Sequence, residues 1–356
     1  MYKSRQPVLP SWLSFLLSVA FVISGITVII FAYLTTQVLW TRSVNPVEAA
    51  AADVAEVELQ MEQDGPALAP VLVPGEPSPT VIPTSAALAG DQRTNILVMG
   101  IDRRPGESFI SRTDSMMLIS VDAQDEKISI LSIPRDLYVM IPGFGRDRVN
   151  TAFVYGSTGN NPAGGAALAM RTLEYNLGIH IDHYVLLDFS AVTKGIDTLG
   201  GVQVYVPVEI NDPTFPDMNY GYDPLYIPAG SQQMDGRTAL KYARTRHIDN
   251  DFGRAMRQQQ VLLAARDKAL GLGMPGLLAR APELFKRVEQ GVRTDLSLEQ
   301  IVELSRTASG IATENIRNEV LDGNYVSPYI TDKGAQVLVL DLEKGTPFIR
   351  SLFYDE

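Results

Sequence analysis

Residues 95–101 have the sequence NILVMGI, and two segments of similar character follow, at 115–121 (SMMLISV) and 127–133 (KISILSI). Short apolar runs bounded by polar or turn residues are typical of β-strands. The polar residues 122–126 (DAQDE) separate the second run from the third and suit a tight turn. The pattern therefore predicts three neighbouring strands, of which the last two form a hairpin.

Beyond these strands, helix-like and strand-like segments alternate. The helix-like segments are 163–177, 191–199, 254–270 and 298–307, and the strand-like segments are 183–188 and 201–206. This mixture predicts an α/β fold in which helices flank a mixed central sheet. We expect one domain over residues 94–356, with 321–356 closing it.

Composition limits the chemistry that this domain can perform. The net charge of -11 argues against nucleic-acid binding, which needs a basic surface. The chain has no cysteine and only three histidines, so thiolate zinc sites and cysteine nucleophiles are excluded. Any metal would be a hard cation on carboxylates, and any anionic ligand must be met by clustered arginines.

The N-terminal part has the pattern of a membrane anchor. Residues 12–34 are an apolar stretch, about 34 Å long as a helix, within a segment that has no charged residue from 11 to 41. Lys3 and Arg5 precede it, which predicts a cytoplasmic tail (1–11), a single-pass anchor (12–40) and an extracellular remainder. The alternative is a signal peptide cleaved near Ala49. Residues 41–93 are rich in Pro and Ala and suit an extracellular linker.

Three polar residues border the predicted strands. Asp102 follows the first strand, Asp114 precedes the second and Arg135 follows the third. If the strands are antiparallel neighbours, all three side chains meet at one rim of the sheet. Two carboxylates with a substrate phosphate are a usual way to hold Mg²⁺, and Arg135 could contact a second phosphate oxygen. Alternatively, each Asp is a turn or cap residue, and Arg135 pairs with Asp136 at the surface.

A second polar cluster lies at residues 242–258. Arg244 and Arg246 are two apart, so they share one side of the chain if the preceding helix ends near residue 243. Asp251 can orient such an arginine, while Arg254 and Gln258, four apart, share a helix face. The alternative is a solvated salt-bridge patch of arginines, Arg257 included, with Asp249 and Asp251.

In this order, the two clusters resemble the LytR-CpsA-Psr family. The resemblance spans about 230 residues, and Val149 and Thr151 depart from it in place of the commoner Ile and Ala. The matching pieces are residues 95–102 (NILVMGID), 112–117 (RTDSMM), 132–136 (SIPRD), 148–152 (RVNTA), 234–236 (MDG) with 239–240 (AL), and 244–259.

The resemblance implies a magnesium-dependent phosphotransferase. Such an enzyme transfers a glycopolymer phosphate from a polyprenyl-pyrophosphate carrier to a hydroxyl of peptidoglycan or a related cell-wall glycan, and polyprenyl phosphate leaves. By this resemblance, Asp102 and Asp114 would bind Mg²⁺ or Mn²⁺. The other implied site residues are Arg135, Arg244 and Arg246 on the pyrophosphate, Asp251 as a catalytic support, and Arg254 and Gln258 in substrate binding.

Two other functions remain open at this point. One is a non-catalytic sensor or scaffold that binds the lipid pyrophosphate during envelope assembly. The other is a pyrophosphatase that uses water as the acceptor. The lipid tail would need an apolar groove, which we expect between the sheet and the helices around 164–177 and 254–270.

Overall fold

The computed structural model describes residues 93–103, 107–217, 221–246 and 249–354. The predicted tail, anchor and linker therefore lie outside the described residues, except Arg93, which already belongs to the first strand. Within the described part of the chain, no helix has the length and apolar character that crossing a bilayer requires.

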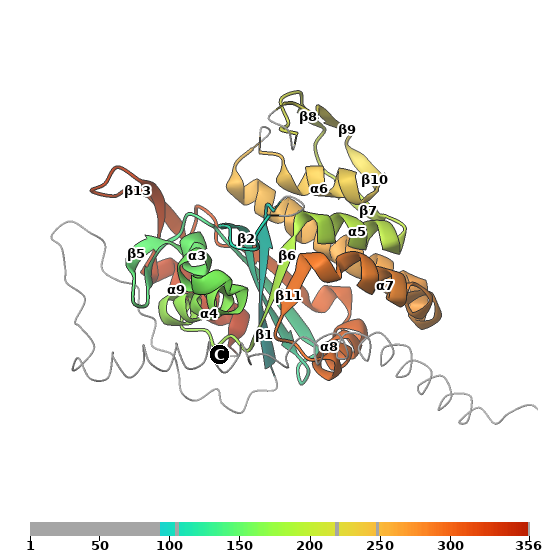
Figure 1. Cartoon of the computed structure of the whole chain (residues 1–356), viewed down its shortest axis with the longest axis horizontal. Helices are drawn as coiled ribbons and strands as arrows, with labels where there is room; N and C mark the ends of the chain where they lie inside the picture. Colours follow the sequence, from blue (N-terminus) through green and yellow to red (C-terminus); the bar gives the residue numbers. More distant parts are fainter. Residues whose placement is uncertain (1–92, 104–106, 218–220, 247–248, 355–356) are drawn as a thin grey trace, which may run out of the picture.

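A six-stranded mixed sheet forms the centre of the domain, in the order β11-β6-β1-β2-β3-β12 (Figure 1). The three predicted strands are β1 (Arg93–Ile101), β2 (Thr113–Asp122) and β3 (Lys127–Ile133), and both pairs among them are antiparallel. The predicted hairpin is thus confirmed. The outer strands are β6 (His183–Asp188), parallel to β1, β12 (Ile316–Val320), parallel to β3, and β11 (Val292–Thr294), antiparallel to β6.

Helices cover both faces of this sheet. Successive strand residues point to opposite faces, so on β2 Met116 and Leu118 join one buried cluster and Met117 joins another. The first cluster is covered by α3 (Ala152–Gly156), α4 (Pro162–Leu177) and α9 (Leu342–Phe353), and the second by α7 (Asp251–Val288) and α8 (Leu298–Gly310). Because α4 and α7 lie on opposite faces, the expectation of one lipid groove lined by both was wrong.

The predicted helices form, with one difference in length. The segment 191–199 is within α5 (Phe189–Leu199), which begins at the capping residue Asp188 and ends at Gly200 in the left-handed region (φ 86°). The predicted helix 254–270 lies in the first part of the 38-residue α7, and a second helical part follows the non-helical Gly273 (φ 62°, ψ 171°). The helix α6 (Gly236–Arg244) precedes it and ends at the first arginine of the second cluster.

The predicted strand 201–206 lies outside the central sheet. It is β7 (Val202–Val206), which pairs with β10 (Gly230–Met234), and the chain between them forms β8 (Ile210–Asp212) and β9 (Leu225–Ile227). The buried residues of these four strands pack on Tyr242 of α6 and Val261 of α7. Two further hairpins are β4 (Tyr138–Ile141) with β5 (Gly145–Arg148), and β13 (Val326–Ile330) with β14 (Gln336–Leu340).

Candidate active site

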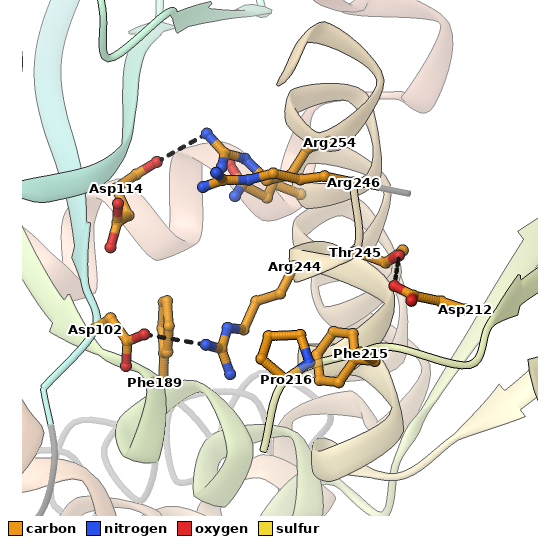
Figure 2. Close-up of a pocket in the computed structure, with 11 residues that line it drawn as sticks. Asp102, Asp114, Phe189, Asp212, Phe215, Pro216, Arg244, Thr245, Arg246 and Arg254 are labelled. Carbon is orange, nitrogen blue, oxygen red and sulfur yellow. Dashed lines mark hydrogen bonds and ion pairs between the residues drawn. The ribbon is translucent and has the colours of Figure 1, made fainter. Parts of the chain in front are cut away.

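Asp102 and Asp114 lie at the edge of the sheet where β1 ends and β2 begins. Ladder pairs join Gly100 to Ser115 and Ile101 to Thr113, so Asp114 is the extra residue of a β-bulge. A bulge changes the direction of a side chain, and bulges are common beside active sites. Both carboxylates line one pocket of about 330 Å³ (Figure 2).

Arg135 joins this edge from the end of β3. One Nη donates to Oδ1 of Asp114 at 2.8 Å, and Nε lies 3.4 Å from Asp251 and 3.5 Å from Asp136. Desolvation opposes the charged form of Arg135, but the three neighbouring carboxylates outweigh it and raise the pKa of Arg135 above its ordinary value. The structure therefore brings Arg135 to the rim where the sequence placed it, and its surface pairing with Asp136 is one contact among several.

Arg244 and Arg246 enter the same pocket from the end of α6. Thr245 between them is extended (φ -60°, ψ 144°), which is the conformation in which residues two apart share one side of the chain. An Nη of Arg244 donates to Oδ2 of Asp102 at 3.0 Å, and its guanidinium lies 4.6 Å from the ring centre of Phe189. Arg246 lies 3.3 Å from Asp251 through Nε. The α6 terminus thus links the second cluster to the first (Figure 2).

The first turns of α7 complete the site. Asp251 contacts three arginines, because Arg254 also lies 3.4 Å away, beside Arg135 and Arg246. Arg254 is only 6% exposed and donates to the backbone carbonyl of Asp114 at 3.3 Å. Burial lowers the pKa of Arg254 to about 10, since desolvation outweighs the attraction of Asp251. Arg254 therefore still carries its charge at neutral pH. Gln258, one turn later, lines the pocket as well.

All eight residues expected from the sequence come together in this region, and their charges define what it can bind. Four are arginines and three are aspartates, so this edge of the sheet concentrates guanidinium groups although the chain is strongly acidic. Guanidinium groups present several N–H donors in a plane, which matches the oxygens of phosphate groups. The arrangement is suited to a phosphorylated ligand. The individual roles of these residues stay predictions.

The carboxylates fit a divalent cation that the ligand helps to hold. Arg244 contacts Oδ2 of Asp102, and Arg135 contacts Oδ1 of Asp114. In the described part of the chain, no group of three or more His, Cys, Asp or Glu side chains could hold a metal alone. Mg²⁺ is usually held by one or two carboxylates plus substrate phosphates and water, so the two aspartates suffice in that mode.

Several pocket residues have no signal in the sequence. Phe189, Phe215 and Pro216 form apolar walls near Arg244 (Figure 2). Asp212 lies at the end of β8, is fully buried, and accepts a hydrogen bond of 2.6 Å from the hydroxyl of Thr245. No local pattern could have shown this contact, because it spans 33 residues between separate elements.

Thr245→Val should therefore destabilise the fold and displace the two flanking arginines. The valine has the same shape but leaves the buried Asp212 carboxylate without this donor, which costs about 1–3 kcal/mol. Urea unfolding monitored by circular dichroism would measure the change in the free energy of unfolding. Thr245→Ser keeps the hydroxyl and is the matched control. Equal stability of all three proteins would show that the hydrogen bond contributes nothing.

An α/β domain that gathers four arginines and three aspartates at one edge of its sheet has the guanidinium donors that suit phosphate groups. Comparison with known families is more specific. The model of the LytR_cpsA_psr family matches residues 60–344, so the chain belongs to the LytR_cpsA_psr family.

Relatives of known name agree with this assignment. The chain is 33% identical over 232 residues to polyisoprenyl-teichoic acid--peptidoglycan teichoic acid transferase TagU of Oceanobacillus iheyensis, covering 65% of this chain and 67% of TagU. It is 36% identical over 173 residues to regulatory protein MsrR of Staphylococcus aureus, 48% of each chain. Solved structures of the same fold include TagT bound to LIIa-WTA (27% identity, TM-score 0.58, 74% of this chain and 90% of TagT) and B. subtilis TagV (26%, 0.57, 75% and 99%).

Proposed function

We propose that this protein transfers a glycopolymer phosphate from a polyprenyl-pyrophosphate carrier to a hydroxyl of peptidoglycan or a related cell-wall glycan. The observation that carries the proposal is the single pocket in which Asp102 and Asp114 face Arg244, Arg246 and Arg254. The names of TagU and of the TagT complex support the choice of a cell-wall polymer as the substrate.

In the proposed reaction, the hydroxyl oxygen of the acceptor bonds to the phosphorus nearest the glycan. The bond from that phosphorus to the bridging oxygen breaks, and polyprenyl phosphate leaves. The proton of the hydroxyl is taken up by this leaving phosphate, so the atoms and charges balance. Such transfers depend mainly on positioning and on neutralising the charge of the phosphoryl oxygens. Mg²⁺ or Mn²⁺ on Asp102 and Asp114 would supply part of that neutralisation when bound.

The arginines supply the rest. Arg135 and Arg254 are held in fixed orientations by Asp114 and Asp251, so they need little reorganisation when a pyrophosphate binds. Arg244 pairs with Asp102 and lies against Phe189, which directs its guanidinium across the pocket. Arg246 is 43% exposed and stands nearest to solvent among these arginines, where it can meet the incoming donor.

The proposed location follows from the same reaction. A polyprenyl carrier is embedded in the membrane, so we propose a single-pass anchor at residues 12–40 that keeps the catalytic domain outside the cell beside its donor. The linker at 41–93 would hold the domain at a distance from the bilayer.

The test uses the full chain in detergent with a short-chain polyprenyl-pyrophosphate glycan and a soluble peptidoglycan fragment. We expect polyprenyl phosphate and coupled glycan to appear together, to stop with EDTA and to return with Mg²⁺ or Mn²⁺. Release of glycan phosphate without the fragment would instead indicate a pyrophosphatase. Binding of the donor with no turnover would favour a sensor or scaffold, the kind of function that the name of MsrR suggests.

A further inference from the structure

Large exposed apolar side chains concentrate in one segment. Among the described residues, the five most exposed are Tyr222 (71%), Val208 (69%), Tyr205 (68%), Ile330 (65%) and Tyr226 (62%). Four of these five lie between residues 205 and 226, and three of the four are tyrosines. Exposed apolar side chains that cluster in this way mark binding surfaces, whereas single ones are ordinary.

These tyrosines share one face of a β-ribbon. The strands β7 and β8 follow each other along one chain segment, and their partners β9 and β10 follow each other along the next. The inner residues of both pairs pack into one buried cluster. Residues that alternate with the inner ones must point outward. Tyr205 lies opposite Ser231, and Tyr226 lies opposite Asn211. We call Tyr205, Asn211, Tyr222, Tyr226 and Ser231 the ribbon face.

The ribbon face borders the active-site pocket. Pro216 lines the pocket and forms an antiparallel bridge with Tyr222. Opposite residues of such a bridge project on the same side, so Tyr222 stands at the rim of the pocket. About 13 Å of extended chain separates Tyr222 from Tyr226, at about 3.3 Å per residue. The face therefore begins at the reacting groups and leads away from them along the ribbon.

Charge separates this face from the pocket. From residue 201 to 235 the sequence has five carboxylates and no Lys, Arg or His. In the structure, Asp223 is neutralised from α6 by Lys241 at 2.7 Å and Arg237 at 2.6 Å. A polyanionic donor or an anionic membrane surface would be repelled by the three other carboxylates that lie outside the pocket, Glu209, Asp217 and Asp235. A neutral ligand with many hydroxyl groups would not be repelled.

We propose that the ribbon face binds the acceptor glycan as a neutral, extended saccharide and directs its hydroxyl into the pocket. This inference rests on the proposed function. Tyrosine gives a large, rigid contact surface at little cost in conformational entropy, and its ring can stack on the apolar face of a sugar. Asn211 and Ser231 add hydrogen-bonding groups beside the rings. The hydroxyl of Tyr226 donates to Glu209 at 3.0 Å, which orients that ring.

The experiment titrates the full chain, in detergent, with a tetramer of β-1,4-linked N-acetylglucosamine in a calorimeter. The test protein is the double variant Tyr222→Ala, Tyr226→Ala. The matched control is Tyr175→Ala, which removes an exposed tyrosine of α4 outside the ribbon. We expect the double variant to bind the tetramer at least about tenfold more weakly, and the control to bind it as the unmodified chain does.

Two further measurements make the outcome decisive. Binding of inorganic pyrophosphate should be the same in the three proteins, because the pocket is lined by the arginines and not by Tyr222 or Tyr226. If the unmodified chain did not bind pyrophosphate or did not catalyse transfer, the proposed function would be rejected. The result for saccharide binding would stand separately. Unchanged affinity of the double variant for the tetramer, or no binding by the unmodified chain, would overturn the inference. The inference would also be overturned if the double variant lost binding to phosphatidylglycerol vesicles but still bound the tetramer.

Discussion

Arg135→Ala should reduce glycopolymer transfer by about 10³-fold while the domain stays folded. Arg135 contacts Asp114, Asp136 and Asp251, so its guanidinium joins the carboxylates of the sheet edge to Asp251 of α7. An arginine that stabilises charge in a phosphoryl transfer typically contributes 10³–10⁵-fold, and a single preorganised donor about 10²–10³-fold. The expected 10³-fold loss is the value at which these two ranges meet.

The measurement compares initial rates at saturating donor and acceptor, with thermal unfolding as the check on the fold. Arg135→Lys keeps the positive charge but loses the planar fork, so it should recover only part of the rate. Arg287→Ala is the matched control, because Arg287 is 48% exposed and pairs with Glu283 one helical turn away. If the rate for Arg135→Ala stayed within tenfold of the rate for the unmodified enzyme, Arg135 would have no part in stabilising the transferred phosphoryl group.

Arg257→Ala should lower the free energy of unfolding by about 3 kcal/mol, the largest stability effect that we expect from an arginine of this cluster, because two buried backbone carbonyls lose their donor. The side chain is 7% exposed and holds both oxygens of Asp249, at 2.6 and 3.0 Å. It also donates to the backbone carbonyls of Tyr242 and Thr245. Its loss would leave these buried acceptors unpaired and release the turn that carries Arg244 and Arg246.

Urea unfolding would measure this loss. Arg317→Ala is the control, since Arg317 is 48% exposed and its contacts lie at the surface. The transfer rate should fall together with stability, because Arg257 acts by positioning the arginines before it. If Arg257→Ala were as stable as Arg317→Ala, this cluster would be the solvated patch that the sequence alone also allowed.

The sheet edge could be predicted because its signals are local. Each of β1, β2 and β3 has an apolar run between polar ends, and short connections make such strands neighbours. The positions of Asp102, Asp114 and Arg135 at one rim then follow from alternating strand directions. The bulge at Asp114 was not predictable, because it depends on which residues pair across two strands.

Helices were harder to place than strands. The apolar period of a helix shows that one side is buried, but not which face of the sheet it covers. For this reason α4 and α7 were expected around one groove, whereas they cover opposite faces. The helix 254–270 was predicted to end close to Gly273, where α7 is interrupted, and the helical part that follows Gly273 was not predicted.

The amino-acid sequence alone was enough for the strand order at the centre, the paired aspartates and the extended Arg-x-Arg segment, because these depend on spacing within short stretches. Tertiary structure decided the rest. It placed Phe189, Asp212 and Pro216 in the pocket and turned three tyrosines outward on the ribbon beside it. These features arise from contacts between distant elements, whose energies depend on packing in three dimensions and leave no periodic signal along the chain.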